Sequence, residues 1–336
     1  MFELVLFLFH FLYSQLFVRL PEPTHDFTGQ TVIVVGANVG LGLEATRHLA
    51  RLNAAKVIMA VRSIERGEAA KRDVAASLSQ AKGSSSTDLQ VWQLDLSDPA
   101  SVLAFARRVN DELPLLDTLL LNASIVPGKF ETRKDGTELT IATNVIGTFL
   151  LAILLLPRLR ATAKKRGVPS HCTIVASEVH HFTQLPARNQ PEIFKALNVV
   201  DEEEVADRYN VSKLMQVFLA REMAGKMNVD EVIVNCVNPG LCATNILRNQ
   251  NDSQKSVVQF LVGIVGRTAE VGSRTLLHAI SAPKDTHGSY LSDCKIKNPA
   301  AFVDSEEGKR TQERLWKELS VILEGIRPGV LKNLEA

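Results

Sequence analysis

Tyr209 and Lys213 are the two residues whose types and spacing most directly suggest chemistry. They lie at i and i+4 in a helical pattern over 205–227, so both side chains share one helix face about one turn apart. A tyrosine with an unperturbed pKa of about 10 is a poor base at neutral pH, whereas a neighbouring ammonium favours the phenolate. Lowering that pKa by about three units requires roughly 4 kcal/mol, an amount that two cations in a desolvated pocket can supply. The pair predicts a tyrosine that gives or takes a proton, although the same spacing also occurs on helices by chance.

Ser177 ends an apolar run over 171–177 that predicts a buried strand. Ligands in open α/β sheets bind outside the carboxyl ends of the strands. Ser177 is therefore placed to donate a hydrogen bond to a carbonyl oxygen that is becoming an alkoxide. His180 and His181 follow, and because adjacent histidines are no metal motif, they either contact substrate or have a structural role. The stretch over 178–208 is predicted to pack over the substrate.

Three glycines follow the first predicted strand, 31–36, and open the first predicted helix, 41–52. They are Gly36, Gly40 and Gly42 in the segment GANVGLG. Glycines permit a tight turn and let backbone N–H groups approach a pyrophosphate, and the helix N-terminus adds partial positive charge. A structural turn is the plain alternative for a glycine run, but the strand–turn–helix context favours a dinucleotide site.

Short β-branched runs alternate with longer helical patterns from Thr31 onward. Alternation of this kind gives a parallel sheet with helices on both faces. We therefore predict an α/β fold with one doubly wound domain over 26–336, preceded by a hydrophobic helix and linker over 1–25. The predicted strands are 31–36, 56–61, 89–95, 116–122, 171–177 and 231–240; the predicted helices are 41–52, 64–79, 99–111, 138–161 and 205–227; and 82–88 is predicted to be a loop.

The order and spacing of these motifs resemble the short-chain dehydrogenase/reductase family. The glycine spacing is G-x-x-x-G-x-G rather than G-x-G-x-x-G, and the matching motifs cover almost the whole domain. The resemblance implies a Rossmann fold and a nicotinamide cofactor, with Asn38 and Leu41 in the cofactor loop. It implies a catalytic set made of Asn144, Ser177, Tyr209 and Lys213. Asn144 would hold a water that relays protons to Lys213, and its alternative role is ordinary helix packing.

The same resemblance implies three more cofactor contacts. Asp95 matches an aspartate that contacts adenine, although it also fits a plain neighbour of a helix N-cap. Asn122 matches a residue of the family's N-N-A-G segment, and Thr244 matches the threonine near the nicotinamide amide and diphosphate. The cofactor-binding set therefore also includes Tyr209 and Lys213. Departures from the family pattern are Val35, Leu121, Ser124, Ala176 and Cys242.

Arg62 directly follows the second predicted strand, where the type of dinucleotide is selected. An NAD site places Asp or Glu there to bind the ribose 2′-hydroxyl. Arg62 can instead pair with a 2′-phosphate, and no carboxylate stands beside it in AVRS. The sequence therefore predicts NADP(H) as the cofactor, against the alternative of a solvated surface arginine.

Residues 1–18 are mostly apolar and need a separate explanation. They lack the basic start and small-residue cleavage site of a signal peptide. As a helix they reach roughly 27 Å at about 1.5 Å per residue, slightly short of a ~30 Å bilayer core. Glu3, His10 and Ser14 share one side and leave a wide apolar face. A membrane tether, interfacial or spanning, and a helix docked on the protein both remain open.

Composition excludes several classes of function. Lys and Arg total 38 against 37 Asp and Glu, a net charge of +1 that gives no electrostatic case for nucleic acid. The 4 cysteines form no C-x-x-C pair, so no metal site is predicted. They are expected to be buried thiols in a reducing compartment, which favours a cytoplasmic protein, with any membrane attachment on the cytosolic face.

Two local segments refine the resemblance. HGSYLSDCK at 287–295 resembles the retinol-dehydrogenase-like branch, and VRSIERGEAAKRD with YNVSKLMQVF resembles fungal reductases of secondary-metabolite pathways. The resemblance implies an oxidoreductase that moves a hydride between nicotinamide and a ketone or alcohol on a lipophilic small molecule. The alternative is a catalytically silent NADP-binding scaffold or regulator. The resemblance also implies pairing into a homo-oligomer, although no interface is legible in the sequence.

Overall fold

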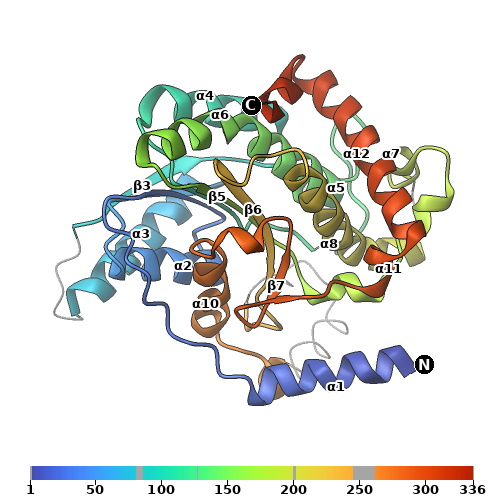
Figure 1. The fold of residues 1–336 in the computed structure, drawn as a ribbon, viewed down its shortest axis with the longest axis horizontal. Helices are drawn as coiled ribbons and strands as arrows, with labels where there is room; N and C mark the ends of the chain where they lie inside the picture. Colours follow the sequence, from blue (N-terminus) through green and yellow to red (C-terminus); the bar gives the residue numbers. More distant parts are fainter. Residues whose placement is uncertain (1, 81–85, 127, 200–201, 245–261, 336) are drawn as a thin grey trace.

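A computed structural model describes residues 2–335 apart from 81–85, 127, 200–201 and 245–261 (Figure 1). Its strands form one 8-stranded sheet in the order β3-β2-β1-β4-β5-β6-β7-β8. Neighbouring strands are parallel except the last pair, which is antiparallel. The chain winds outward from β1 in both directions, so the predicted doubly wound Rossmann fold is confirmed. The strands are β1 (Thr31–Val35), β2 (Lys56–Val61), β3 (Asp88–Gln93), β4 (Thr118–Leu121), β5 (Ser170–Val175), β6 (Val232–Asn238), β7 (Tyr290–Ser292) and β8 (Lys295–Lys297).

Helices cover both faces of this sheet (Figure 1). Strand β1 shows why, because Val32 and Val34 enter one hydrophobic cluster while Ile33 and Val35 enter the other. Side chains alternate across a strand, so a continuous apolar run must be buried on both sides. One face packs on α2 (Gly40–Arg51), α3 (Ile64–Gln80) and α10 (Ala269–Ala279), and the other on α4 (Pro99–Glu112), α6 (Thr148–Arg166) and α8 (Glu202–Ala224).

The helix predicted over 138–161 is longer than expected and is interrupted. It consists of α5 (Leu139–Ile141), a π-helical turn η1 (Ala142–Gly147) and α6. Within the described chain, Leu139–Arg166 is the run that is long and apolar enough to cross a membrane, yet 89% of its apolar window is buried inside the protein. It is therefore the central core helix of the fold.

The N-terminal helix α1 (Phe2–Phe17) docks on the protein through polar side chains. Ser14 Oγ donates to the Asp293 carboxylate at 2.8 Å, and Gln15 Nε2 donates to the carbonyls of Leu241 and Val265 at 2.9 and 3.1 Å. Apolar side chains point outward instead, with Phe17 70% exposed. These contacts favour the docked alternative over a spanning helix.

The segment between β5 and α8 is fixed to the C-terminal helix. It contains the short turns η2 (Glu178–Phe182) and η3 (Pro186–Asn189) and the helix α7 (Ile193–Ala196). Glu318 in α12 (Glu306–Ile326) accepts hydrogen bonds from the N–H groups of Ile193 and Phe194, both at 3.0 Å. Helix α7 therefore packs beside α12, as Figure 1 shows, while η2 packs against α8. The remaining elements are α11 (Ala301–Asp304), η5 (Lys284–Thr286) and η6 (Val330–Leu334).

Candidate active site

The four predicted catalytic residues meet at the carboxyl end of the sheet. Ser177 lies just beyond β5, Asn144 in the π-helical turn, and Tyr209 and Lys213 on α8. The Ser177 side chain hydrogen-bonds Tyr209, and the Lys213 ammonium lies 5.5 Å from the centre of the tyrosine ring. Four residues spread over 70 positions of sequence are thus brought together, because the strand end and two helices converge there.

Burial raises the pKa of Tyr209 above its ordinary value of 10, and the hydrogen bond from Ser177 opposes this only in part. The Glu178 carboxylate nearby raises that pKa further. In the chain by itself, loss of solvent outweighs the nearby polar groups. The predicted lowering of the Tyr209 pKa requires two cations in the pocket and stays a prediction for the cofactor-bound enzyme. Tyr209 keeps its proton at neutral pH and is suited to donate it.

Lys213 is buried, with 1% of its surface exposed, and its ammonium has three protein acceptors. Nζ donates to Ser124 Oγ at 2.7 Å, to the Val175 carbonyl at 2.7 Å and to Gln216 Oε1 at 3.0 Å. Burial lowers the pKa of Lys213 to about 7. The charge on this lysine is therefore set by its surroundings within the neutral pH range.

Asn144 is fully buried, and both the oxygen and the nitrogen of its side-chain amide form hydrogen bonds. Its Oδ1 accepts from the Ile125 N–H at 2.9 Å, and its Nδ2 donates to the Ile125 carbonyl at 2.9 Å and to Ser212 Oγ at 3.0 Å. Its backbone carbonyl accepts from Gln216 Nε2 at 2.7 Å. The link from Asn144 to Lys213 therefore runs through the Gln216 side chain, which the sequence did not indicate.

The glycine loop is tightly packed where a dinucleotide is expected. Gly36 and Gly40 have φ angles of +79° and +58°, which favour glycine. A Cβ at Gly42 would overlap the Gly36 carbonyl oxygen, so the third glycine lets the loop close on α2. Asn122 Nδ2 donates to the carbonyls of Val35 and Gly36 at 3.0 and 3.2 Å and ties β4 to this loop.

The remaining predicted cofactor residues surround this loop. Asn38 lies within it, and Leu41 is in the first turn of α2. Thr244 faces Gly40, since a Cβ on that glycine would lie 3.3 Å from Thr244 Cγ2. The N-terminus of α2 has no side-chain hydrogen bond at its cap residue, which is Val39. Its first N–H groups are thus available to an anionic ligand.

Arg62 and Asp95 differ in the contacts that their side chains make within the protein. Arg62 is exposed at the end of β2, and no ion pair to it is found among the described residues. Asp95 Oδ1 accepts from the N–H and Oγ of Ser97 at 2.9 and 2.6 Å, ahead of the α4 cap residue Asp98. The structure gives Asp95 the turn role, and its contact with adenine stays a prediction.

His180 has a structural role. Its Nδ1 donates to the Ser177 carbonyl at 2.6 Å and its Nε2 accepts from the Ala300 N–H at 3.0 Å, so it fixes the backbone of the predicted catalytic serine. Burial lowers its pKa to about 3, which keeps the ring neutral. Glu178 is a neighbour that the sequence reading missed: burial raises its pKa to about 7, and it accepts from Asn238 Nδ2 at 3.4 Å.

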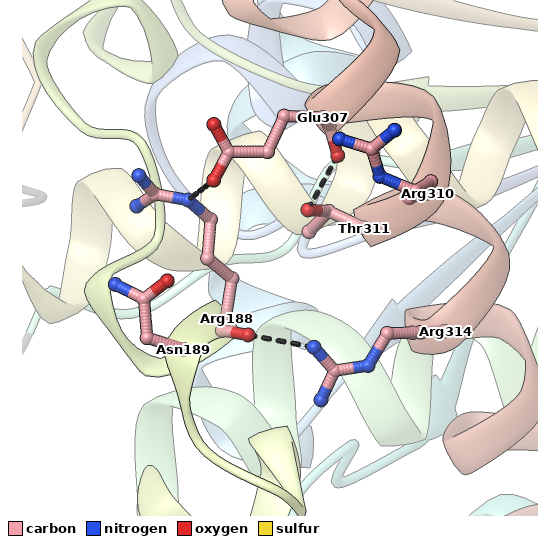
Figure 2. Close-up of a pocket in the computed structure, with 6 residues that line it drawn as sticks. All are labelled: Arg188, Asn189, Glu307, Arg310, Thr311 and Arg314. Carbon is pink, nitrogen blue, oxygen red and sulfur yellow. Dashed lines mark hydrogen bonds and ion pairs between the residues drawn. The ribbon is translucent and has the colours of Figure 1, made fainter.

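Figure 2 shows a separate surface pocket of about 330 Å³ between η3 and α12. An ion pair of 2.8 Å joins Arg188 to Glu307 across it, and Arg314 donates to the Arg188 carbonyl at 2.6 Å. No residue predicted for the active site lines this pocket. Among the described residues, no cluster of three or more His, Cys, Asp and Glu side chains is placed to hold a metal ion.

Comparison with known proteins places this geometry in a family. Residues 30–170 match the family model for short chain dehydrogenases. The chain is 42% identical over 330 residues to the short chain dehydrogenase/reductase dmxR8 of Cryptosporiopsis sp. (strain 8999), covering 96% of this chain and 99% of that protein. It is also 42% identical to the short-chain dehydrogenase anuD of Penicillium roqueforti (strain FM164), covering 95% and 84%.

Solved structures share the fold at lower identity. The NADPH-bound carbonyl reductase from chicken fatty liver superposes with a TM-score of 0.60 at 21% identity, covering 82% of this chain and 96% of that one. An alcohol dehydrogenase from the archaeon Thermococcus sibiricus, complexed with 5-hydroxy-NADP, gives 0.55 at 18% identity, covering 78% and 95%. The full-length relatives, the matching family model and the shared fold lead to one conclusion: this chain is an oxidoreductase of the short-chain dehydrogenase/reductase family.

Proposed function

We propose that this enzyme uses NADPH to reduce a ketone or aldehyde on a lipophilic small molecule, as a tailoring step of secondary-metabolite biosynthesis. The protonation of Tyr209 supports reduction rather than oxidation as the direction of the reaction. Tyr209 is hydrogen-bonded by Ser177 and keeps its proton because burial raises its pKa. A protonated phenol is the form that can donate to a carbonyl oxygen. The fungal relatives and the local resemblance of YNVSKLMQVF support the substrate class.

Each site residue then has a defined task. Bound NADPH supplies the hydride that adds to the carbonyl carbon. Ser177 donates a hydrogen bond to the carbonyl oxygen, where negative charge develops, and Tyr209 donates the proton that makes the hydroxyl. Lys213 would turn one of the three N–H groups that it gives to protein acceptors toward the ribose hydroxyls, and it stabilises the phenolate that Tyr209 leaves. Asn144 fixes the turn that faces Lys213.

The residues around the glycine loop fit such a cofactor. The uncapped start of α2 offers backbone N–H groups to a diphosphate, and Asn122 and Thr244 close the loop from two sides. Arg62, exposed at the end of β2, supports NADP(H) over NAD(H). Asn38, Leu41 and Asp95 complete the proposed cofactor contacts.

A panel assay tests the proposal. Purified protein is expected to consume NADPH with lipophilic ketones, and Tyr209→Phe is expected to lower kcat by about 10²-fold or more because the proton donor is lost. NADPH binding, followed by its fluorescence, should change little. The exposed Tyr13 offers a matched control, Tyr13→Phe, which should keep full activity. NADPH binding without turnover across the whole panel would instead favour the silent scaffold.

We also propose a cytosolic location. All four cysteines are free thiols, as expected for a protein in a reducing compartment. The outward apolar face of α1, with Phe9 and Phe17, would attach the enzyme at most to the cytosolic face of a membrane. Cell fractionation with protease protection tests both parts, and a domain shielded inside sealed vesicles would contradict them.

A further inference from the structure

The three acceptors around Lys213 Nζ differ in what they can do with a proton. The Val175 carbonyl, at 2.7 Å, can only accept a hydrogen bond. The Gln216 side chain, at 3.0 Å, presents its carbonyl oxygen and carries no exchangeable proton on that atom. The Ser124 hydroxyl, at 2.7 Å, is the one acceptor of the three that can also donate.

Gln216 occupies the line between Lys213 and Asn144. Its Oε1 faces the ammonium and its Nε2 donates to the Asn144 carbonyl at 2.7 Å. The side chain is 1% exposed, so it lies inside the core on the α8 face that carries Lys213. The Gln216 amide holds the Lys213 ammonium in place by this hydrogen bond. It does not pass a proton from Asn144 to Lys213, because its Oε1 carries no proton.

Ser124 lies between two residues that are fixed by hydrogen bonds. On one side, Asn122 is tied to the Val35 and Gly36 carbonyls of the glycine loop. On the other, the backbone N–H and C=O of Ile125 pair with the Asn144 amide. Unlike Lys213 and Gln216, Ser124 is only partly buried. Its hydroxyl therefore connects a buried ammonium with the more open side of the site.

We propose that Ser124 relays protons between Lys213 and solvent, while Gln216 positions the ammonium and closes the route through Asn144. The proposal rests on the roles given above to Tyr209 and Lys213. For each carbonyl reduced, NADPH gives one hydride and Tyr209 gives one proton. Tyr209 recovers its proton from the Lys213 side, Lys213 takes one from the Ser124 hydroxyl, and Ser124 takes one from water, so that the net proton comes from solvent.

Two substitutions of equal shape test the relay. Ser124→Thr keeps a hydroxyl, whereas Ser124→Val replaces it with a methyl group. With NADPH and benzil, a lipophilic diketone, at about pH 6, the valine variant is expected to lose about 10²-fold in kcat and the threonine variant to recover most of it. The dissociation constant of NADPH should stay within about threefold for both. The solvent isotope effect on kcat should differ between the valine variant and wild type.

Two substitutions at Gln216 test the positioning role, because they should shift the pH dependence of NADPH binding in opposite directions. Gln216→Met and Gln216→Glu both remove the donor to the Asn144 carbonyl, so they differ only in what faces Lys213. Burial alone accounts for the lowered pKa of Lys213, and Tyr209 is the titratable side chain facing it. The pH above which NADPH binding weakens should fall by about one unit in the methionine variant and rise by at least as much in the glutamate variant. A purely structural role would move both in the same direction.

The outcomes separate this proposal from the proposed function. Turnover by Tyr209→Phe, or no benzil reduction by wild type, counts against the proposed function, and the NADPH titrations of the Gln216 pair still decide whether Gln216 sets the charge of Lys213. If Tyr209→Phe is inactive but Ser124→Val keeps the wild-type kcat and isotope effect, the relay through Ser124 is overturned. Equal shifts in the two Gln216 variants overturn the positioning role.

Discussion

Loss of solvent sets the protonation of the site residues before any ligand binds. It raises the pKa of Tyr209, lowers that of Lys213 to about 7 and raises that of Glu178 to about 7. In each case burial favours the neutral form. The sequence identified Tyr209 and Lys213 from their spacing, but spacing carries no information about how strongly each side chain is desolvated in the fold.

Glu178 gives a pH-dependent test of this burial. A carboxyl whose pKa is raised on folding, here from 4.5 to about 7, contributes stability below about pH 4.5 that is lost as the pH rises through about 7. Glu178→Gln keeps an acceptor for Asn238 and cannot ionise. Its melting temperature is therefore expected to exceed that of wild type by more at about pH 8 than at about pH 5. A difference that is independent of pH would show that Glu178 ionises as freely in the fold as in the unfolded chain.

Among the elements, the strands that carry the site were the most predictable. Strands β1, β2 and β4 are nearly continuous apolar runs, because both of their faces are buried, whereas β3 (DLQVWQ) is partly exposed and carries polar residues. Strands β7 and β8 span only Tyr290–Ser292 and Lys295–Lys297, too short for a pattern to indicate them, and α10 was also missed. The π-helical turn depends on packing: a Cβ at Gly147 would overlap the Leu96 carbonyl oxygen. The contacts of Gln216 and Ser124 join residues far apart in sequence, so spacing alone did not reveal them.

The turn from β1 to α2 predicts a sharp contrast between two glycines. Gly42→Ala should weaken NADPH binding by more than about tenfold and lower the melting temperature, since the new Cβ would overlap Gly36 and lie 2.6 Å from Asn122 Nδ2. Gly325→Ala is the matched control, because no atom lies within 4 Å of its Cβ and alanine favours the helix by about 0.5–1 kcal/mol. Fluorescence titration and melting curves measure both. Normal NADPH binding by Gly42→Ala would mean that the loop does not hold the cofactor.

The end of β2 predicts the choice of cofactor. Arg62→Ala should weaken NADPH binding by roughly 10- to 100-fold, the scale of lost hydrogen bonds to a charged group, and NADH binding much less. Arg107→Ala, an exposed arginine on α4, is the control and should change neither. Dissociation constants for both cofactors decide the matter. Equal losses for NADPH and NADH would remove Arg62 from the 2′-phosphate.

At the scale of the whole molecule, Arg267 joins three distant segments. Its guanidinium donates to the Ser14 carbonyl of α1 at 2.9 Å, to the Pro239 carbonyl after β6 at 3.1 Å, and to Asp293 between β7 and β8 at 2.7 Å. The side chain is 4% exposed, so this ion pair is shielded from solvent. The first helix of the chain is thereby connected to the turn that precedes Thr244.

Substitutions on the two faces of α1 should therefore act differently. Gln15→Leu removes the donor to the Leu241 and Val265 carbonyls and is expected to lower the melting temperature by about 2–4 °C per kcal/mol lost and to weaken NADPH binding. Phe17→Ser, on the outward face, should leave both unchanged while reducing sedimentation with lipid vesicles. Deleting residues 1–18 should act like Gln15→Leu on stability. A deletion that only releases the enzyme from vesicles would show a tether without a structural role.

The polar face of α1 that contacts the protein also decides where an affinity tag is best attached. The last turn of α1 lies against the Pro239–Gly240 turn, since a Cβ at Gly240 would lie 2.5 Å from Gln15 Oε1. The C-terminus lies on the opposite side of the molecule (Figure 1). An affinity tag or fusion partner joined ahead of α1 would disturb these contacts and is expected to lower the melting temperature. The C-terminal end is the safer place to attach one.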